Sequence, residues 1–168
     1  DAEVPKSDPW AGHQANLASM GGVPDWQTLN YLSNITPQKS ELNQGPWARL
    51  EDQERNLSKD PTIDQVYVAT GPLYEKFIGT LPGTNKTHTI PSGYWKIIFV
   101  GTSPENGLYA SFVMNQNTPR SASFCAFQVT VAEIEERSGL TFWQGLPQPV
   151  QDALKSKQGQ LHSRLGCK

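Results

Sequence analysis

Four side chains that could do chemistry recur every four residues in the middle of the chain. They are Asn43, Trp47, Glu51 and Arg55. These residues share one side of a helix if that helix extends back to Asn43. The Asn43 amide and the Glu51 carboxylate offer oxygen atoms that suit a hard, hydrated cation such as Mg²⁺. Arg55 could orient that carboxylate or hold a phosphate, whereas the alternative is an ordinary solvated ion pair between Glu51 and Arg55.

Three histidines, His13, His88 and His162, lie far apart in the sequence. His13 follows Gly12 in a loop-like segment, and a near-neutral imidazole beside a phosphate makes a good general base for water. The alternative for His13 is a surface residue without a chemical role. No spacing of histidines and cysteines matches a structural zinc site, and the sequence has neither a glycine-rich phosphate loop nor a Gly-x-Ser-x-Gly motif.

The two cysteines, Cys125 and Cys167, are 42 positions apart. One interpretation is two unrelated buried thiols, and the other is a disulfide that ties the C-terminal segment to a strand. Such a bridge would stabilise the folded chain by roughly 4 kcal/mol, because it restricts the unfolded chain. It would also imply an oxidising compartment.

The elements that would position these groups begin with a strand predicted at residues 29–35. Asn30 and Asn34 share one face of that strand, which indicates polar groups directed at a site; half-exposed asparagines beside a turn are the alternative. A helix is predicted within residues 40–57. Its Pro46 fits best in the first turn, which leaves open whether Asn43 lies inside the helix or just before it.

The rest of the chain indicates a sheet with short helices. Further strands are predicted at residues 65–70, 94–100, 108–114 and 124–129. Thr130 and Glu133 form a capping-box pattern, and the helix that they begin should end near Gly139. A short last helix or turn is predicted at residues 150–155. We therefore expect an α+β fold, with a central, mainly antiparallel sheet flanked by helices.

Composition and charge narrow the classes of function. The chain has 168 residues, enough for one domain, and its aromatic content of 10% excludes intrinsic disorder. The longest apolar run, residues 97–100, is far shorter than the roughly 20 residues that span a bilayer, so we expect no membrane partner. A formal net charge of −2 excludes a protein that coats nucleic acid by bulk positive charge, but not an enzyme that binds a few phosphates.

Three motifs in this order resemble the DNA/RNA non-specific endonuclease family. They are GHQANLASM at 12–20, LNYLSNITPQ at 29–38 and LNQGPWARLEDQER at 42–55. The likeness is to the secreted Serratia-type branch of the ββα-metal, or His–Me finger, superfamily. It continues in shorter segments at residues 70–74, 81–84, 89–95, 130–140 and 165–167. The resemblance implies a ββα-metal core in one domain over residues 1–168, shortened at its N-terminus and without the N-terminal strands of the family.

The resemblance also implies a role for each matching residue. His13 matches the general base that takes a proton from the attacking water, and Asn43 matches the single protein ligand of Mg²⁺. Glu51 matches the acid that holds a water of that metal, and Arg55 a cation near the scissile phosphate. Substrate-binding residues would be Asn30, Asn34, Gln38 and Trp47. Cys125 and Cys167 match a family disulfide.

The implied activity is Mg²⁺-dependent hydrolysis of phosphodiester bonds in DNA and RNA, giving 5′-phosphate products. Contacts to backbone phosphates would explain indifference to base sequence and to sugar. Mn²⁺ is a substitute cation that the resemblance suggests. It also suggests a homodimer and a nuclease inhibitor as protein partners, and a secreted or periplasmic location with any signal peptide outside these residues.

The sequence departs from the family pattern near its N-terminal end. The family histidine usually follows Asp-Arg-Gly, whereas here the run is Trp10-Ala11-Gly12-His13. A further family arginine lies upstream, and Lys6 is the only cation among residues 1–9. Two alternatives to an active enzyme therefore stay open. One is a catalytically impaired nucleic-acid-binding or interaction module on the same scaffold, and the other is a fragment that needs an upstream chain.

Overall fold

The structure is a computed structural model, and it describes residues 38–63, 65–79, 89–101 and 106–168. The strand predicted at 29–35 lies outside these residues, as do the candidate site residues His13, Asn30 and Asn34. The remaining candidate residues fall within the described ranges.

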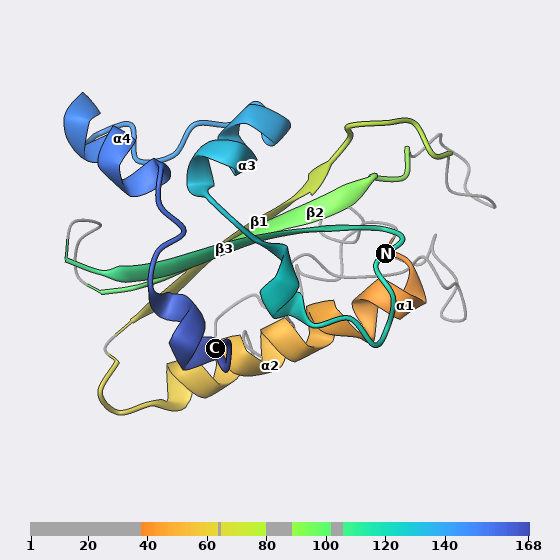
Figure 1. The fold of residues 1–168 in the computed structure, drawn as a ribbon, viewed down its shortest axis with the longest axis horizontal. Helices are drawn as coiled ribbons and strands as arrows, with labels where there is room; N and C mark the ends of the chain where they lie inside the picture. Colours follow the sequence, from red (N-terminus) through yellow and green to blue (C-terminus); the bar gives the residue numbers. More distant parts are fainter. Residues whose placement is uncertain (1–37, 64, 80–88, 102–105) are drawn as a thin grey trace, which may run out of the picture.

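An antiparallel sheet forms the centre of the described fold (Figure 1). Its strands lie side by side in chain order: β1 (Val66–Leu73), β2 (Gly93–Val100), β3 (Leu108–Asn115) and β4 (Gln128–Val129). Val100 of β2 is in register with Val66 of β1 and with Leu108 of β3, so each strand runs back along the one before it. This topology confirms the predicted α+β class.

Helices cover both faces of this sheet (Figure 1). One face carries α1 (Ser40–Asn43), α2 (Pro46–Lys59) and the 3₁₀ helices η3 (Phe124–Phe127) and η4 (Leu161–Leu165). The other carries α3 (Val131–Ser138) and α4 (Gln148–Lys155). None of the helices in this part of the chain has the length and apolar character that crossing a membrane requires.

β2 is buried along its whole length because both of its faces are covered. Tyr94 and Ile98 pack into the core beneath α2, together with Leu50. Trp95 and Ile97 alternate with them and pack into the second core, beneath α3 and α4. The continuous apolar character of this strand follows from this position between two layers.

The strand predicted at 124–129 is wrong over most of its length. Residues 124–127 form the 3₁₀ helix η3, and only the last two residues pair with β3. The Ser123 hydroxyl accepts a hydrogen bond from the Cys125 N–H at 3.3 Å, which turns the chain. Phe124 then packs edge-on against Phe112, with ring centres 5.8 Å apart. Local capping and core packing thus override the β propensity of this segment.

The predicted start and end of α3 are confirmed. The Thr130 hydroxyl accepts a hydrogen bond from the Glu133 N–H at 3.2 Å, and Gly139 ends the helix with φ of 77°. The last predicted helix begins two residues earlier than expected, as α4.

A disulfide joins Cys125 to Cys167, with their Cα atoms 5.6 Å apart. It ties the C-terminal segment to η3 on the α2 face of the sheet. The implied pairing is therefore present, although Cys125 lies in a 3₁₀ helix and not in a strand.

Candidate active site

The candidate residues that the structure describes lie on and beside α1 and α2. Asn43 is the last residue of α1, and its N–H donates to the Lys39 carbonyl at 2.9 Å. The helix breaks at Gln44 and Gly45, and Pro46 begins α2, where a missing N–H leaves no hydrogen bond unmade. Asn43 therefore lies just before the long helix. Trp47, Glu51 and Arg55 share α2, but Asn43 does not belong to it.

The loop between β3 and η3 holds this junction in place. A Cβ atom at Gly45 would meet the Glu41 carbonyl oxygen of α1 and would lie 2.7 Å from the Cα of Arg120, so the close approach of α1 and this loop requires glycine here. Arg49 of α2 donates to the Arg120 carbonyl at 2.7 Å. The Arg120 guanidinium in turn lies 3.3 Å from the Glu41 carboxylate of α1. Because both helices contact the same loop, the position of Asn43 between them is fixed.

Glu51 is the acid of α2 that lacks a partner: within the described residues, no hydrogen bond or ion pair involves its carboxylate. Burial raises the pKa of Glu51 from 4.5 to about 7, although the positive charge of Lys96 opposes this rise. Arg55 pairs instead with Asp52. The solvated Glu51–Arg55 pair, the alternative interpretation of the spacing, is thus replaced by a different pairing on the same helix.

A buried ion pair beneath α2 is a feature that the sequence reasoning missed. The Lys96 ammonium of β2 contacts the Glu54 carboxylate of α2, and their side chains are only 2% and 7% exposed. The same ammonium lies 4.5 Å from the centre of the Trp47 ring. The sequence does contain a sign of this pair, because Lys96 is the charged residue of an otherwise largely apolar strand. It lies on the same face of β2 as Tyr94 and Ile98.

Trp47 lies in the core and not on an accessible surface. It is 1% exposed, and its ring centre lies 5.7 Å from that of Tyr94. A side chain so enclosed by the sheet supports α2 rather than contacting a substrate. We therefore leave Trp47 out of the substrate contacts proposed below.

The polar atoms of this region fit a hard cation by their chemistry. Gln38 is 2% exposed, and its Oε1 atom is buried without a hydrogen-bond partner. Asn43 adds a half-buried amide oxygen, and Glu51 a half-buried carboxylate without a partner. Mg²⁺ prefers such oxygen ligands and retains several waters, so it needs few protein ligands. In the described ranges, no three His, Cys, Asp or Glu side chains form a metal-binding group.

Comparison with known proteins identifies relatives over most of the chain. The family model described as DNA/RNA non-specific endonuclease matches residues 11–149. The Nuclease of Serratia marcescens is 63% identical over 157 residues, which are 94% of this chain and 59% of that protein. Nuclease C1 of Cunninghamella echinulata var. echinulata is 32% identical over 145 residues, which are 80% of this chain and 57% of that protein. The chain thus spans less than two thirds of these relatives.

The fold also has a solved counterpart. A crystal structure of the EndoG/EndoGI complex, described as showing the mechanism of EndoG inhibition, matches with a TM-score of 0.64 and 26% identity. The match covers 85% of this chain and 62% of that chain. Since the family model covers most of the sequence and the fold agrees, this chain belongs to the DNA/RNA non-specific endonuclease family.

Proposed function

We propose that this chain is the catalytic part of a Mg²⁺-dependent endonuclease that hydrolyses phosphodiester bonds of DNA and RNA to 5′-phosphate products. The observation that carries the proposal is the state of Glu51, a carboxylate with a pKa of about 7 and no partner in the described structure. Burial of an acid without a partner costs stability, and acids with perturbed pKa values concentrate at functional sites. Family membership supplies the reaction class.

Each candidate site residue would have a separate role in the reaction. His13 would take the proton from the attacking water as general base. Glu51 would hold and orient a water beside the phosphate, and Arg55 would offset the growing negative charge. Asn43 would hold Mg²⁺ or Mn²⁺, which supplies positive charge at the phosphate when bound. Further polar contacts to the substrate would come from Asn30, Asn34 and Gln38.

A plasmid-nicking assay tests this assignment. The purified chain should nick DNA and cut RNA with Mg²⁺ and stop on addition of EDTA, and the 5′ ends should be ligatable. His13→Ala and Asn43→Ala should each lower the rate by at least about 100-fold, because each removes a group from the reacting centre. Asn56→Ala is the matched control, since Asn56 is an exposed asparagine on the neighbouring helix α2. Equal rates for the wild type and Asn43→Ala would refute the metal-ligand role.

The motif Trp10-Ala11-Gly12-His13 favours a second candidate function. Without the Asp-Arg that precedes the family histidine, the chain would bind nucleic acid and cut it slowly or not at all. Binding of DNA in the absence of nicking, under Mg²⁺ and with intact fold, would support this candidate. Nicking that appears only when an upstream segment is added would identify the chain as a fragment of the enzyme.

We also propose a secreted or periplasmic location, because the Cys125–Cys167 disulfide requires an oxidising compartment. The solved EndoG structure is a complex with EndoGI, which supports a protein inhibitor as a partner of this chain. A homodimer is the other proposed partner. Light scattering of the purified chain, alone and with a candidate inhibitor, distinguishes these assemblies.

A further inference from the structure

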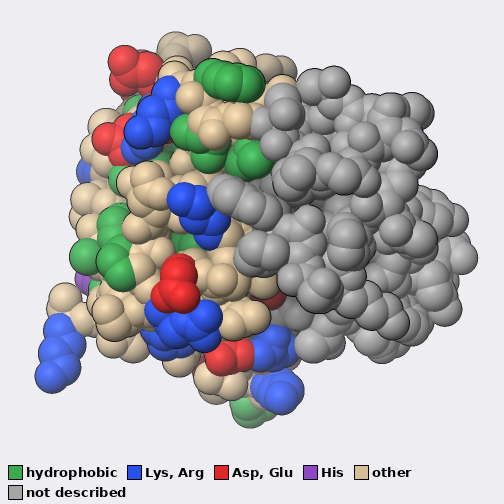
Figure 2. All heavy atoms as spheres, turned by 90° about the vertical axis from the view of Figure 1, so that its right-hand side faces the viewer, with side chains coloured by type: hydrophobic (Ala, Val, Ile, Leu, Met, Phe, Trp, Pro, Cys, Tyr) green, Lys and Arg blue, Asp and Glu red, His purple; other side chains and the backbone are tan. Residues whose placement is uncertain are grey.

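A polar cavity of about 460 Å³ lies at the end of the sheet where β2 begins and β3 ends. We call it the sheet-end pocket. Its lining includes Lys39, Lys76, Arg137 and Glu75, with Ser92 and Asn117 among the polar neighbours. Lys and Arg side chains occur at several places on the corresponding side of the molecule (Figure 2).

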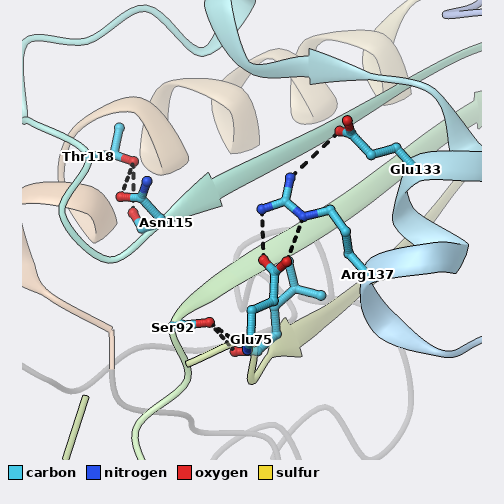
Figure 3. A network of polar contacts seen from close by, with 7 residues as sticks. Glu75, Ser92, Asn115, Thr118, Glu133 and Arg137 are labelled. Atoms are coloured by element: carbon cyan, nitrogen blue, oxygen red, sulfur yellow. Dashed lines mark hydrogen bonds and ion pairs between the residues drawn. The ribbon is translucent and has the colours of Figure 1, made fainter. Parts of the chain in front are cut away.

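Among the described residues that line this pocket, positive charges outnumber negative ones. Arg137 of α3 forms a two-point ion pair with Glu75, with N–O distances of 2.7 and 2.9 Å, and lies 3.6 Å from Glu133 (Figure 3). The hydrogen bond from Arg137 holds the pKa of Glu75 below its usual range, so this carboxylate stays ionised and offsets the arginine. Lys39 and Lys76 add two further positive charges to the described lining, within a chain whose formal net charge is −2.

The positively charged lining is built into the fold. The Lys39 ammonium donates to the Asn117 side-chain oxygen at 2.9 Å, and the Lys39 N–H donates to Gln116 at 2.8 Å. The Glu75 N–H donates to Ser92 at 2.9 Å, which anchors the segment that carries Lys76. These bonds fix the Lys39 ammonium and the backbone that leads into Lys76, whose own side chain is exposed.

The pocket begins one helical turn from the proposed metal ligand. Lys39 precedes α1 directly, and its carbonyl accepts the hydrogen bond from Asn43 at 2.9 Å. Four residues of helix rise by about 6 Å. A nucleic-acid strand carries a phosphate for roughly each 3.4 Å of its axis, so a strand with one phosphate at Asn43 would bring its next phosphates to this distance.

We propose that the sheet-end pocket is a second phosphate subsite, in which Lys39 and Lys76 hold the backbone of the nucleic acid beside the bond that is cut. This inference rests on the proposed function and adds a place where the strand is held outside the reacting centre. Phosphate contacts of this kind carry no sequence information, in keeping with a non-specific enzyme.

The test measures binding without turnover. The affinity for a fluorescent 12-nucleotide single-stranded DNA is measured by anisotropy in EDTA, from about 50 to 200 mM salt. Lys76→Gln should weaken binding about five- to tenfold at low salt and lower the slope of log K against log salt by about 0.7, one lost phosphate contact. The double variant Lys39→Gln/Lys76→Gln should lower this slope by about 1.4, which corresponds to two lost phosphate contacts. Lys59→Gln, an exposed lysine at the far end of α2, is the matched control and should leave the slope unchanged.

The outcomes separate this inference from the proposed function. If the wild type nicks plasmid but Lys76→Gln keeps its affinity and slope, the subsite is wrong and the nuclease assignment stands. If the wild type does not nick but the slopes fall as expected, the subsite stands and the enzyme assignment fails. Equal losses in Lys76→Gln and Lys59→Gln would also overturn the subsite, because they would show only an effect of net charge.

Discussion

The two faces of the central sheet bury different kinds of side chain. Beneath α3 and α4, the sheet presents Trp95 and Ile97, and the ring of Trp95 packs edge-on against Phe142 at 5.3 Å. Beneath α2, the same strand presents Lys96, paired with Glu54 and covered by Trp47.

An ion pair also occurs on the first face, between Lys155 and Glu135 at 2.9 Å, but it joins two helices and does not arise from the sheet. A charge on a central strand is costly to desolvate, and apolar residues of similar volume often serve stability as well. The α2 face, which carries the candidate site, is therefore the face on which the described sheet itself buries a charged side chain.

The largest effect is expected from breaking the buried ion pair. Glu54→Gln should lower the free energy of unfolding by about 3–5 kcal/mol, because it leaves the Lys96 ammonium buried beside a neutral partner. The double variant Glu54→Leu/Lys96→Met should recover most of that loss. Urea unfolding of the wild type and the two variants measures both effects. A loss below about 1 kcal/mol in the single variant would show that the pair is not a principal element of this face.

Removing the disulfide comes next. Cys125→Ser/Cys167→Ser should lower the free energy of unfolding by about 2–4 kcal/mol, because the crosslink closes a loop of 42 positions in the unfolded chain. Thermal unfolding with and without reductant gives the same comparison in the wild type. Two free thiols in the unfolded, non-reduced protein would contradict the crosslink.

A large-to-small change on each face should separate stability from activity. Ile134→Ala on α3 and Leu50→Ala on α2 both empty fully buried positions, so each should cost about 2–3 kcal/mol. Only Leu50→Ala should also slow nucleic-acid cleavage in the folded protein, because Leu50 is the neighbour of Glu51. Cleavage rates at a temperature well below both unfolding transitions decide this, and equal rates would remove the functional distinction between the faces.

The smallest effect is a gain of stability. Because burial raises the pKa of Glu51 to about 7, the native state binds a proton that the unfolded state releases near pH 4.5. Stability contributed by this proton is full below pH 4.5 and is lost as the pH rises towards and beyond 7. Glu51→Gln should therefore be about 1–2 kcal/mol more stable than the wild type at pH 8 and equal at pH 4. The exposed Glu136→Gln is its control, and a difference that does not vary with pH would contradict the raised pKa.

Much of the fold was accessible from sequence, since it follows from local pattern. The apolar strands and the spacing of Leu50, Glu54 and Leu57 predict β1 to β3 and the buried face of α2, and Thr130 with Gly139 predicts the ends of α3. The strand at 124–129 failed because a serine cap and the burial of Phe124 turn the chain locally.

The candidate site was accessible only in part. The four-residue spacing pointed to Asn43, Glu51 and Arg55, but the contact of Gly45 with Arg120 joins residues that are far apart in sequence. The pairing of Lys96 with Glu54 and the raised pKa of Glu51 are tertiary effects, set by what the sheet buries. The spacing of residues along one helix predicts neither this ion pair nor this pKa.

The contact of Gly45 with Arg120 limits how the molecule can be engineered. Surface loops are usually permissive places to insert a tag or fuse a domain. Arg120 of the β3–η3 loop is exposed, but this loop packs against the junction between α1 and α2. Residues added to the loop would therefore shift Asn43.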